Sequence, residues 1–464
     1  MNENIKRYYD FLKSKKIAFI GVGVSHTELI KMYSEKGFDV TICDKSPLEK
    51  IKEKLTGINL DKIKFNLGEN YLENISEFDV IFRTPGMKFY IPELNNARLN
   101  GCVVTSEMEV FFDLCPCKII AVTGSDGKTT TTTLISEMLE KQGYTVHLGG
   151  NIGRALLPII EDVKSDDFAV VELSSFQLIS MRKSPNISVV TNLEPNHLDM
   201  HKDMQEYIDA KKNIFIHQNA FSKTVLNLDN EITKSFAEIT RGDTWYFSRR
   251  QTVNKGTFLS DDGYLCVKVD GETTKLFNKD VIRIPGIHNV ENYLTAISAI
   301  WGLVNKENIE FVAKNFGGVE HRIEFVRELN GVKWYNDSIA SSPSRAIAGL
   351  NSFNERIILI AGGYDKKIPY EPLAPYVNEK VKILILCGAT AEKIENAVKN
   401  DSSYNPEKIK IIRAKDVEDA VNIAYKEAKS GDIVSLSPAS ASFDFYPNFE
   451  VRGRHFKQLV MNLK

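Results

Sequence analysis

Residues 121–153 read "AVTGSDGKTTTTTLISEMLEKQGYTVHLGGNIG", and this stretch decides the fold. An apolar strand pattern ends in a turn with Gly124 and Gly127, and Lys128 and Thr129 follow at once, before a helical pattern begins. In such a turn the backbone N–H groups point at phosphates, the lysine neutralises the terminal phosphate, and the next hydroxyl can hold Mg²⁺. Glycine turns and threonine caps are also common without a ligand. That alternative does not explain a lysine between glycine and threonine directly after a strand, so the stretch predicts a nucleotide-binding loop.

The loop departs from the longest form of the phosphate-binding pattern. In that form the first glycine stands five residues before the glycine that precedes the lysine, and this chain has Val122 there. We therefore interpret "TGSDGKTT" as a shorter variant. Its candidate ATP-binding residues are Gly124, Ser125, Asp126, Gly127, Lys128, Thr129 and Thr130.

A strand–helix–strand pattern precedes this loop. "KKIAFIGVGVS" is followed by the helical "HTELIKMYSEKG" and by "FDVTICD", which ends at Asp44. Two glycines at the turn resemble a dinucleotide fingerprint, but His26 stands where a third glycine would let the helix approach the sheet. NAD binding is therefore weakly supported, although the turn could hold another diphosphate. "FDVIFRTPG" adds a strand whose turn, with Thr84, would lie at the same carboxyl edge.

Strand patterns rich in aliphatic residues recur along the rest of the chain. "FAVVELSS" and "ISVVTNL" follow the loop, and "RIILIAGG", "VKILILCG" and "DIVSLSP" come after residue 318. Nearly continuous apolar strands separated by helices are typical of parallel sheets covered on both faces. We expect an α/β protein of three consecutive domains: a Rossmann-like domain at 1–115, a central P-loop-type ATPase domain at 116–317 and a Rossmann-like domain at 318–464.

The composition excludes several classes of protein. Lys plus Arg (59) nearly equals Asp plus Glu (61), so no overall field favours nucleic acid or anionic lipid. No window approaches the roughly 20 apolar residues that span a bilayer. The polar N-terminus lacks the apolar segment of a secretory signal. We expect a cytoplasmic protein that acts on small molecules, without nucleic-acid or membrane partners.

Two charged residues fall on apolar patterns. Glu172 ends an apolar strand, where a carboxylate needs an ion pair or a metal; with Thr129 it could complete a Mg²⁺ shell. Lys211 lies on the apolar stripe of "DMQEYIDAKKNIF". From the pattern alone, an ammonium reaching solvent is the favoured interpretation of Lys211. His197, after "EPN", would more often be a loop or core residue.

A series of blocks resembles the Mur ligase superfamily. They are "VELSSFQL" (171–178), "TNLEPNHLDMH" (191–201), "YIDAKK" (207–212), "PGIHNVEN" (285–292), "EHRIEF" (320–325), "YNDSIASS" (335–342) and "SLSPASASFDFYPNFEVRG" (435–453). With the two earlier turns the resemblance spans residues 16–453. "ELSSFQL" resembles the members that add D-glutamate. The resemblance implies an ATP-dependent ligase of cytoplasmic peptidoglycan precursor synthesis, joining D-glutamate to UDP-N-acetylmuramoyl-L-alanine through an acyl phosphate, and we expect it to be a monomer.

The resemblance also implies roles for individual residues. It implies two Mg²⁺ sites, held by Thr129, Glu172, His197 and a carbamylated Lys211. Catalysis would rest on Lys128, Glu172, His197, Lys211 and Arg322. Further ATP contacts would be Asn289, Asn292, Arg322 and Asp337. Substrate would be bound by Ser25, Asp44, Thr84, Asn151, Gln177 and His197, and the amino acid by Lys366, Ser442, Phe443 and Phe449.

Some of these roles have a plain alternative or a departure. Asn289 and Asn292 could cap their helix instead of binding nucleotide. Arg322 could pair with the glutamate on either side of it, and Lys367 could replace its neighbour Lys366. The family usually has lysine where this chain has Ile339. Arg345, six positions on, is a hypothetical substitute for that charge.

Two other classes of function remain open from the residues alone. A nicotinamide-dependent oxidoreductase would use residues 16–44 and release no ADP. A regulatory or motor ATPase would hydrolyse ATP without a muramoyl substrate.

Overall fold

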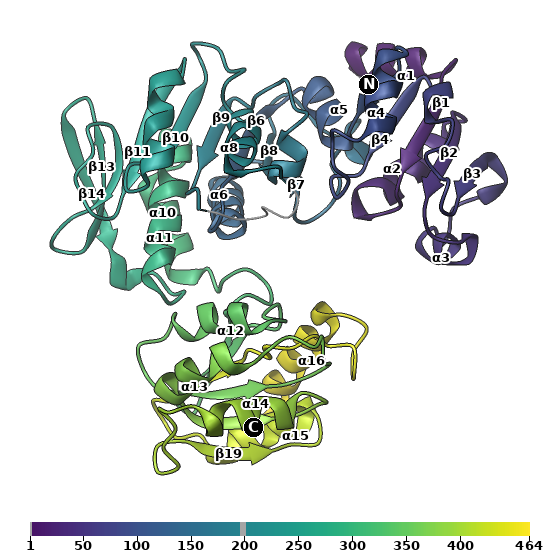
Figure 1. Ribbon diagram of the computed structural model, residues 1–464. Helices are drawn as coiled ribbons and strands as arrows, with labels where there is room; N and C mark the ends of the chain where they lie inside the picture. Colours follow the sequence, from purple (N-terminus) through teal and green to yellow (C-terminus); the bar gives the residue numbers. More distant parts are fainter. Residues whose placement is uncertain (1, 195–200) are drawn as a thin grey trace. The chain divides into compact units, whose positions relative to one another are not determined.

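The computed structural model describes residues 2–194 and 201–464. It is an α/β protein whose three sheets follow one another along the chain, as the sequence predicts (Figure 1). By backbone contacts the chain divides into two compact units, Met1–Lys279 with Glu291–Val312, and Asp280–Val290 with Ala313–Lys464. The boundaries at 115/116 and 317/318 remain predictions. None of the described helices combines the length and apolar character needed to cross a membrane.

The first sheet is parallel, with the strand order β3-β2-β1-β4-β5. Its strands are β1 (Lys16–Ile20), β2 (Asp39–Asp44), β3 (Ile63–Leu67), β4 (Val80–Arg83) and β5 (Val103–Thr105). The accompanying helices are α1 (Glu3–Leu12), α2 (Val24–Glu35), α3 (Leu48–Lys54), α4 (Pro92–Leu99) and α5 (Glu107–Leu114), with 3-10 turns η1 (Leu60–Lys62) and η2 (Ile75–Glu77). This order brings the carboxyl ends of β1, β2 and β4 together, where ligands bind in open α/β sheets.

The second sheet has the order β14-β13-β12-β11-β10-β9-β6-β8-β7. Its strands are β6 (Lys118–Thr123), β7 (Val146–Gly150), β8 (Phe168–Glu172), β9 (Ile187–Val190), β10 (Lys223–Asn227), β11 (Asp243–Ser248), β12 (Gly256–Leu259), β13 (Tyr264–Val269) and β14 (Glu272–Asn278). Its helices are α6 (Lys128–Gln142), α7 (Ser175–Leu178), α8 (Met204–Lys212), α9 (Glu231–Ser235), α10 (Ile287–Ile300) and α11 (Lys306–Asn315), with η3 (Leu157–Ile159), η4 (Phe236–Ile239) and η5 (Lys279–Val281). Only the β12–β13–β14 edge is antiparallel in the part of the sheet described.

The third sheet has the order β15-β16-β20-β17-β18-β19, parallel except for the β15–β16 pair. Its strands are β15 (Glu324–Leu329), β16 (Val332–Asn336), β17 (Ile357–Ala361), β18 (Val381–Leu386), β19 (Lys410–Arg413) and β20 (Ile433–Leu436). Its helices are α12 (Pro343–Leu350), α13 (Ala374–Lys380), α14 (Ala391–Asn400), α15 (Val417–Glu427) and α16 (Phe449–Asn462), with η6 (Glu371–Leu373).

One apolar core serves the first two sheets. It runs without a break from Phe19 and Tyr33, through Phe111 of α5, to Leu157 of η3 and Val171 of β8. The third sheet has separate cores on its two faces, one around Leu359 and one around Trp334. Because the first core is shared, burial of α5 contributes to both sheets at once.

Candidate functional site

The turn between β6 and α6 is the predicted nucleotide loop, and its two glycines are required by geometry. Gly124 has φ +152° and Gly127 has φ +75°, backbone conformations that residues other than glycine rarely adopt. A Cβ on Gly124 would lie 1.8 Å from Thr191 Oγ1, and one on Gly127 would lie 2.5 Å from Asn292 Oδ1. The backbone can therefore take this path only without side chains at these two positions.

The rest of the loop is fastened to the segment after β9. Asn192 Oδ1 accepts a hydrogen bond from Asp126 N at 2.9 Å, and Ser125 Oγ bonds Tyr207 Oη at 2.9 Å. Thr191 Oγ1 donates to Asp126 O at 2.6 Å. The loop is thus held from outside, while the side chain of Asp126 stays exposed and Thr130 is buried in the first turn of α6.

Thr129, Glu172 and Asn151 meet beside this loop, as the sequence analysis expected of Thr129 and Glu172. Thr129 Oγ1 donates to Glu172 Oε2 at 2.7 Å, and Asn151 Nδ2 donates to Glu172 Oε1 at 2.7 Å. The carboxylate is buried, and the two side chains that donate to it are neutral, one in the first turn of α6 and one directly after β7. The cluster offers oxygen atoms of the kind that Mg²⁺ binds.

Two lysines lie against the carbonyl groups of the loop. Lys128 Nζ donates to Gly124 O at 3.0 Å and to Ser125 O at 2.8 Å. Lys211 Nζ donates to Thr123 Oγ1 at 3.0 Å and to Gly124 O at 2.9 Å. Lys211 is only 2% exposed, so the interpretation that its ammonium reaches solvent is wrong. Burial, together with repulsion from Lys128, lowers the pKa of Lys211 well below its usual value, and attraction to Glu172 opposes the shift.

The first sheet assembles Asp44 and Thr84 around the turn that follows β1. Asp44 Oδ2 accepts from Val22 N at 3.0 Å, and a Cβ on Gly21 would lie 3.2 Å from the Thr84 methyl carbon. Ser25 is half-buried in the first turn of α2. These three predicted substrate residues therefore surround one helix start.

His26 explains how this turn closes without a third glycine. Its ring is fully buried against Phe19, and its Nδ1 donates to Gly21 O at 2.8 Å. Burial lowers the pKa of His26 to about 4, so the ring is neutral at physiological pH. The imidazole fills the space between the helix and the sheet.

α7 (Ser175–Leu178) begins three residues after Glu172 and has a complete capping box. Ser174 Oγ accepts from Gln177 N at 3.3 Å, and Gln177 Oε1 accepts from Ser174 N at 2.9 Å. The carbonyl of Gln177 is thus occupied within the helix, which leaves its amide N–H groups as the groups suited to a substrate. The predicted ligand His197 lies outside the described residues.

The two asparagines of α10 are buried and differ in their contacts. Asn292 Oδ1 accepts from Thr131 Oγ1 at 3.4 Å, in addition to its position beside Gly127. Asn289 Nδ2 donates to Pro285 O at 2.5 Å. Asn292 therefore lies beside the nucleotide loop.

In the C-terminal unit, Arg322 stands on a strained turn. The residues on either side of it, His321 and Ile323, have φ angles of +65° and +45°. Such angles in residues other than glycine are unfavourable and persist only where the surroundings impose them. The guanidinium is exposed. The carboxylates of Glu320 and Glu324 both contact Lys457 Nζ instead. The alternative interpretation, an ion pair between Arg322 and one of these glutamates, is therefore wrong within the described residues.

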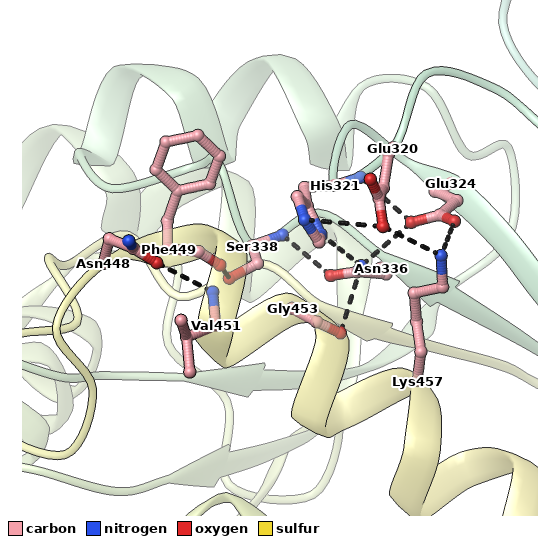
Figure 2. Close-up of polar contacts among 10 residues, drawn as sticks. All are labelled: Glu320, His321, Glu324, Asn336, Ser338, Asn448, Phe449, Val451, Gly453 and Lys457. Atoms are coloured by element: carbon pink, nitrogen blue, oxygen red, sulfur yellow. Dashed lines mark hydrogen bonds and ion pairs between the residues drawn. The ribbon is translucent and has the colours of Figure 1, made fainter. Parts of the chain in front are cut away.

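Figure 2 shows what imposes this turn. Asn336 Nδ2 donates to His321 Nδ1 at 2.9 Å and to Glu324 Oε2 at 3.0 Å, and Glu324 Oε2 also accepts from His321 N at 2.9 Å. A Cβ on Gly453 would lie 2.1 Å from His321 Nδ1, so α16 is packed directly against the ring. The strained backbone is thus held by buried polar contacts and close packing.

The same cluster does not suit a metal ion. Glu320, His321 and Glu324 place three ligand atoms within 4.8 Å of one another. However, the Lys457 ammonium already contacts both carboxylates. Because Nδ1 of His321 accepts from Asn336, the proton is on Nε2, the atom nearer Glu320, where a ligand nitrogen must be unprotonated. We interpret the cluster as support for the turn.

Asp337 and Arg345 lie on either side of Ile339. Asp337 is buried, its Oδ2 accepts from Ser437 Oγ at 2.7 Å, and burial raises its pKa to about 7. Ile339 itself precedes α12, yet Arg345 Nη1 donates to Ile339 O at 3.3 Å. The arginine therefore reaches the segment from which the family's usual lysine is missing.

The residues predicted to bind the amino acid come from two adjacent loops and α16. Lys366 is exposed after β17, and Ser442 and Phe443 follow β20, joined by the bond from Tyr364 N to Ala441 O at 2.9 Å. Phe443 is 60% exposed. Phe449, at the start of α16, contacts the His321 ring with centroids 5.9 Å apart. Lys367, the alternative to Lys366, is also exposed.

Sequence reasoning missed a buried arginine in this unit. Arg452 Nη2 donates to Ser338 O at 2.9 Å, and its Nη1 donates to Ala441 O at 3.0 Å, so it joins the loops after β16 and β20. Burial lowers its pKa to about 10. The residue lies within "NFEVRG", and an arginine among apolar helix positions was the available signal.

The fold and the nucleotide loop define a class: an α/β protein of three successive sheets, with a short phosphate loop in the second. Residues 122–300 match the Mur ligase middle domain, and residues 321–440 match the glutamate ligase domain of Mur ligases. The chain belongs to the Mur ligase family.

Relatives and solved structures agree with this membership. The UDP-N-acetylmuramoylalanine--D-glutamate ligases of Acetivibrio thermocellus and Ruminiclostridium cellulolyticum are 54% and 51% identical, and each comparison covers 100% of both chains. UDP-N-acetylmuramate-alanine ligase MurC of Thermotoga maritima, 17% identical, has a TM-score of 0.58 over 97% of this chain and 100% of its own. A pseudomurein peptide ligase type C of Methanothermus fervidus, 20% identical, has a TM-score of 0.54 over the same shares. The two structures show the fold alone.

Proposed function

We propose that this chain is an ATP-dependent ligase that joins D-glutamate to UDP-N-acetylmuramoyl-L-alanine in peptidoglycan precursor synthesis. The observation that carries the proposal is the full-length identity of 54% to a ligase named for this reaction. ATP first phosphorylates the free carboxylate of the muramoyl substrate, and ADP leaves. The amine of D-glutamate then attacks the acyl phosphate, and phosphate leaves as the amide forms.

At the nucleotide, the chain's own groups neutralise and orient the phosphates. Lys128 is placed by its bonds to Gly124 O and Ser125 O, and it would exchange these neutral acceptors for a phosphate oxygen. The N-terminus of α6 is the positive end of the helix dipole, which favours an anion. The proposal adds Asn289, Asn292, Arg322 and Asp337 as further ATP residues, and Arg322 is suited because its guanidinium is exposed on a rigid turn.

The oxygen atoms beside the loop fit a magnesium ion. Thr129 Oγ1 and Glu172 Oε2 are 2.7 Å apart, close enough to share one ion. Bound there, Mg²⁺ would neutralise charge on the β- and γ-phosphates. We assign the first site to Thr129 and Glu172, and a second to Glu172, Lys211 and His197.

Lys211 can be a ligand only after modification. A protonated ammonium cannot bind a cation, but a neutral amine can react with CO₂ to give a carbamate and a proton. The lowered pKa of Lys211 supports this reaction because it increases the share of the neutral amine, which is the form that reacts. The carbamate would supply two oxygen atoms beside the phosphate loop.

The substrates are assigned to the remaining residues. Ser25, Asp44 and Thr84 surround the start of α2 and would hold the uridine diphosphate, whereas Asn151, Gln177 and His197 would contact the muramoyl part. Lys366, Ser442, Phe443 and Phe449 would bind D-glutamate, with the lysine opposite a carboxylate. These substrates are water-soluble, which supports a cytoplasmic enzyme, and we propose that it acts as a monomer.

The test measures ADP release by the purified protein with ATP, Mg²⁺ and UDP-N-acetylmuramoyl-L-alanine, and with D-glutamate, L-glutamate or D-aspartate as the amino acid. We expect release to require the muramoyl substrate and to be supported by D-glutamate above the other two. Lys128→Ala should abolish it, whereas Lys141→Ala, on the same helix but outside the loop, should not.

Release that does not depend on the amino acid would contradict the proposed reaction, and release without any muramoyl substrate would favour a regulatory ATPase instead.

A further inference from the structure

Arg83 is a buried arginine at the end of β4, in no predicted role. It is 1% exposed. Its Nη1 donates to Met87 O at 2.8 Å and to Thr84 O at 3.2 Å, so one side of the guanidinium holds the loop that follows β4. Its Nη2 donates to Phe176 O at 2.9 Å, in α7 of the second sheet. One side chain therefore joins two segments that are 93 residues apart.

The charge of Arg83 is kept in the interior by matching polar groups. Burial lowers the pKa of Arg83 to about 10, so the guanidinium is still protonated at neutral pH. Attraction to the Glu109 carboxylate opposes that shift of the Arg83 pKa. The two are linked through Ser180, whose Oγ accepts from Arg83 Nη2 at 3.4 Å and donates to Glu109 Oε2 at 2.9 Å. A buried charge with this many partners is costly to break on one side.

The two segments joined by Arg83 are both next to predicted substrate residues. The loop contains Thr84, which faces the turn after β1. α7 contains Gln177 and starts three residues after Glu172. A change in the distance between them would move the uridine side of the substrate relative to the phosphate loop.

We propose that Arg83 is a positioning residue that fixes the Thr84–Met87 loop to α7, so that the nucleotide-sugar substrate lies in register with the bound ATP. The inference rests on the proposed function, since that function supplies the substrate. Arginine is required for geometric reasons, because its planar fork donates to carbonyls on two sides at once, whereas the single ammonium of lysine does not.

The test compares Arg83→Ala and Arg83→Lys with wild type and with Arg182→Ala. Arg182 is the matched control because, within residues 2–194 and 201–464, its hydrogen bonds go to carbonyls of its own segment, Ile179 O and Met181 O. We expect Arg83→Ala to raise the KM for UDP-N-acetylmuramoyl-L-alanine by about tenfold or more, with the KM for ATP changed less than about twofold. Arg83→Lys should not restore it, and millimolar methylguanidinium should restore part of it in Arg83→Ala alone.

Calorimetric titration with UDP-N-acetylmuramoyl-L-alanine measures binding without turnover. If Arg83→Ala does not fold, Ser180→Ala is a milder variant. For Ser180→Ala we expect the same selective loss of affinity for this substrate, smaller in size. An unchanged KM in Arg83→Ala, equal losses for both substrates, or full activity of Arg83→Lys would overturn the role of Arg83. If wild type itself neither binds nor uses this substrate, the proposed function fails instead.

Discussion

Lys211 is buried beside the phosphate loop, and its replacement tests whether it becomes a carbamate. We expect Lys211→Ala to lower turnover by about a hundredfold or more, because it removes the group that would become an oxygen ligand. Added acetate should restore part of the activity, since a short carboxylate can enter the space left by the side chain. Lys212→Ala, which removes the neighbouring lysine that bonds Asp209, should remain active.

A carbon-13 label supplied as CO₂ should also give a carbamate resonance in wild type that is absent from Lys211→Ala. Absence of that resonance at neutral pH, together with no effect of acetate, would contradict the carbamate.

Replacement of Gly453 is expected to change both stability and turnover. A methyl group there would lie 2.1 Å from His321 Nδ1 and 2.7 Å from His321 Cε1, so the ring would have to move. We expect Gly453→Ala to lower the free energy of unfolding of the C-terminal unit by about 1–3 kcal/mol. Turnover should fall further than stability explains, because the turn that carries Arg322 shifts. Thermal unfolding and ADP release measure the two effects.

The neighbouring exposed Arg454, changed to alanine, is the control for Gly453→Ala and should leave both measurements near wild type. A Gly453→Ala protein with normal turnover at a temperature where it is folded would show that the turn does not depend on this packing.

Between elements, Glu107 joins α5 to η3. Its Oε1 accepts from Leu156 N at 2.8 Å and Leu157 N at 2.7 Å, and burial raises its pKa from 4.5 to about 7. Because the folded protein holds the proton more tightly than the unfolded chain does, this contribution to stability is full below about pH 4.5 and is lost as the pH rises through about 7.

Glu107→Gln keeps an accepting oxygen without the charge. From pH 5 to pH 8 we expect wild type to lose up to about 3 kcal/mol of unfolding free energy relative to Glu107→Gln. Urea unfolding at the two pH values measures the difference. Parallel pH profiles for the two proteins would be the contrary result.

The elements that sequence predicted well are those whose signal is local. The apolar runs that became β6, β8, β17 and β18 carry their burial in consecutive residues, and a glycine turn follows β6, β17 and β18. The antiparallel edge β12–β14 was not predicted, because β14 is mostly exposed and reads as polar. Asp44 and Glu172 could be chosen as site residues because each ends a strand, and Thr129 could be chosen because it follows Lys128 in the loop pattern.

Other site features depend on contacts that a sequence does not display. Arg83 is placed by the backbone carbonyl of Phe176, and a carbonyl has no sequence identity. The strain around Arg322 depends on Gly453, which is more than a hundred residues away. Lys211 lies on an apolar helical stripe, and the sequence does not show whether its ammonium group reaches solvent. The packing of the folded chain buries it.

At the scale of the whole molecule, the first two sheets should unfold together. Their side chains form one apolar core, and Lys36 Nζ and Glu161 Oε1, 2.6 Å apart, add an ion pair across it. In native-state hydrogen exchange we expect the amides of β1 and β6 to share one opening free energy, with β17 free to differ. Clearly faster exchange throughout β1 would mean that the first sheet opens by itself.

The shared core also limits how parts of this family could be recombined. A graft that exchanges only the first five strands for those of a relative would leave α5 facing a foreign surface on one side and its native partner on the other. A workable chimaera would have to import α5 with its new sheet, and would also need η3 and the partners of Arg83 redesigned to match. We therefore expect substrate preference in this chain to depend on the contacts between the first two sheets, and not on the first sheet alone.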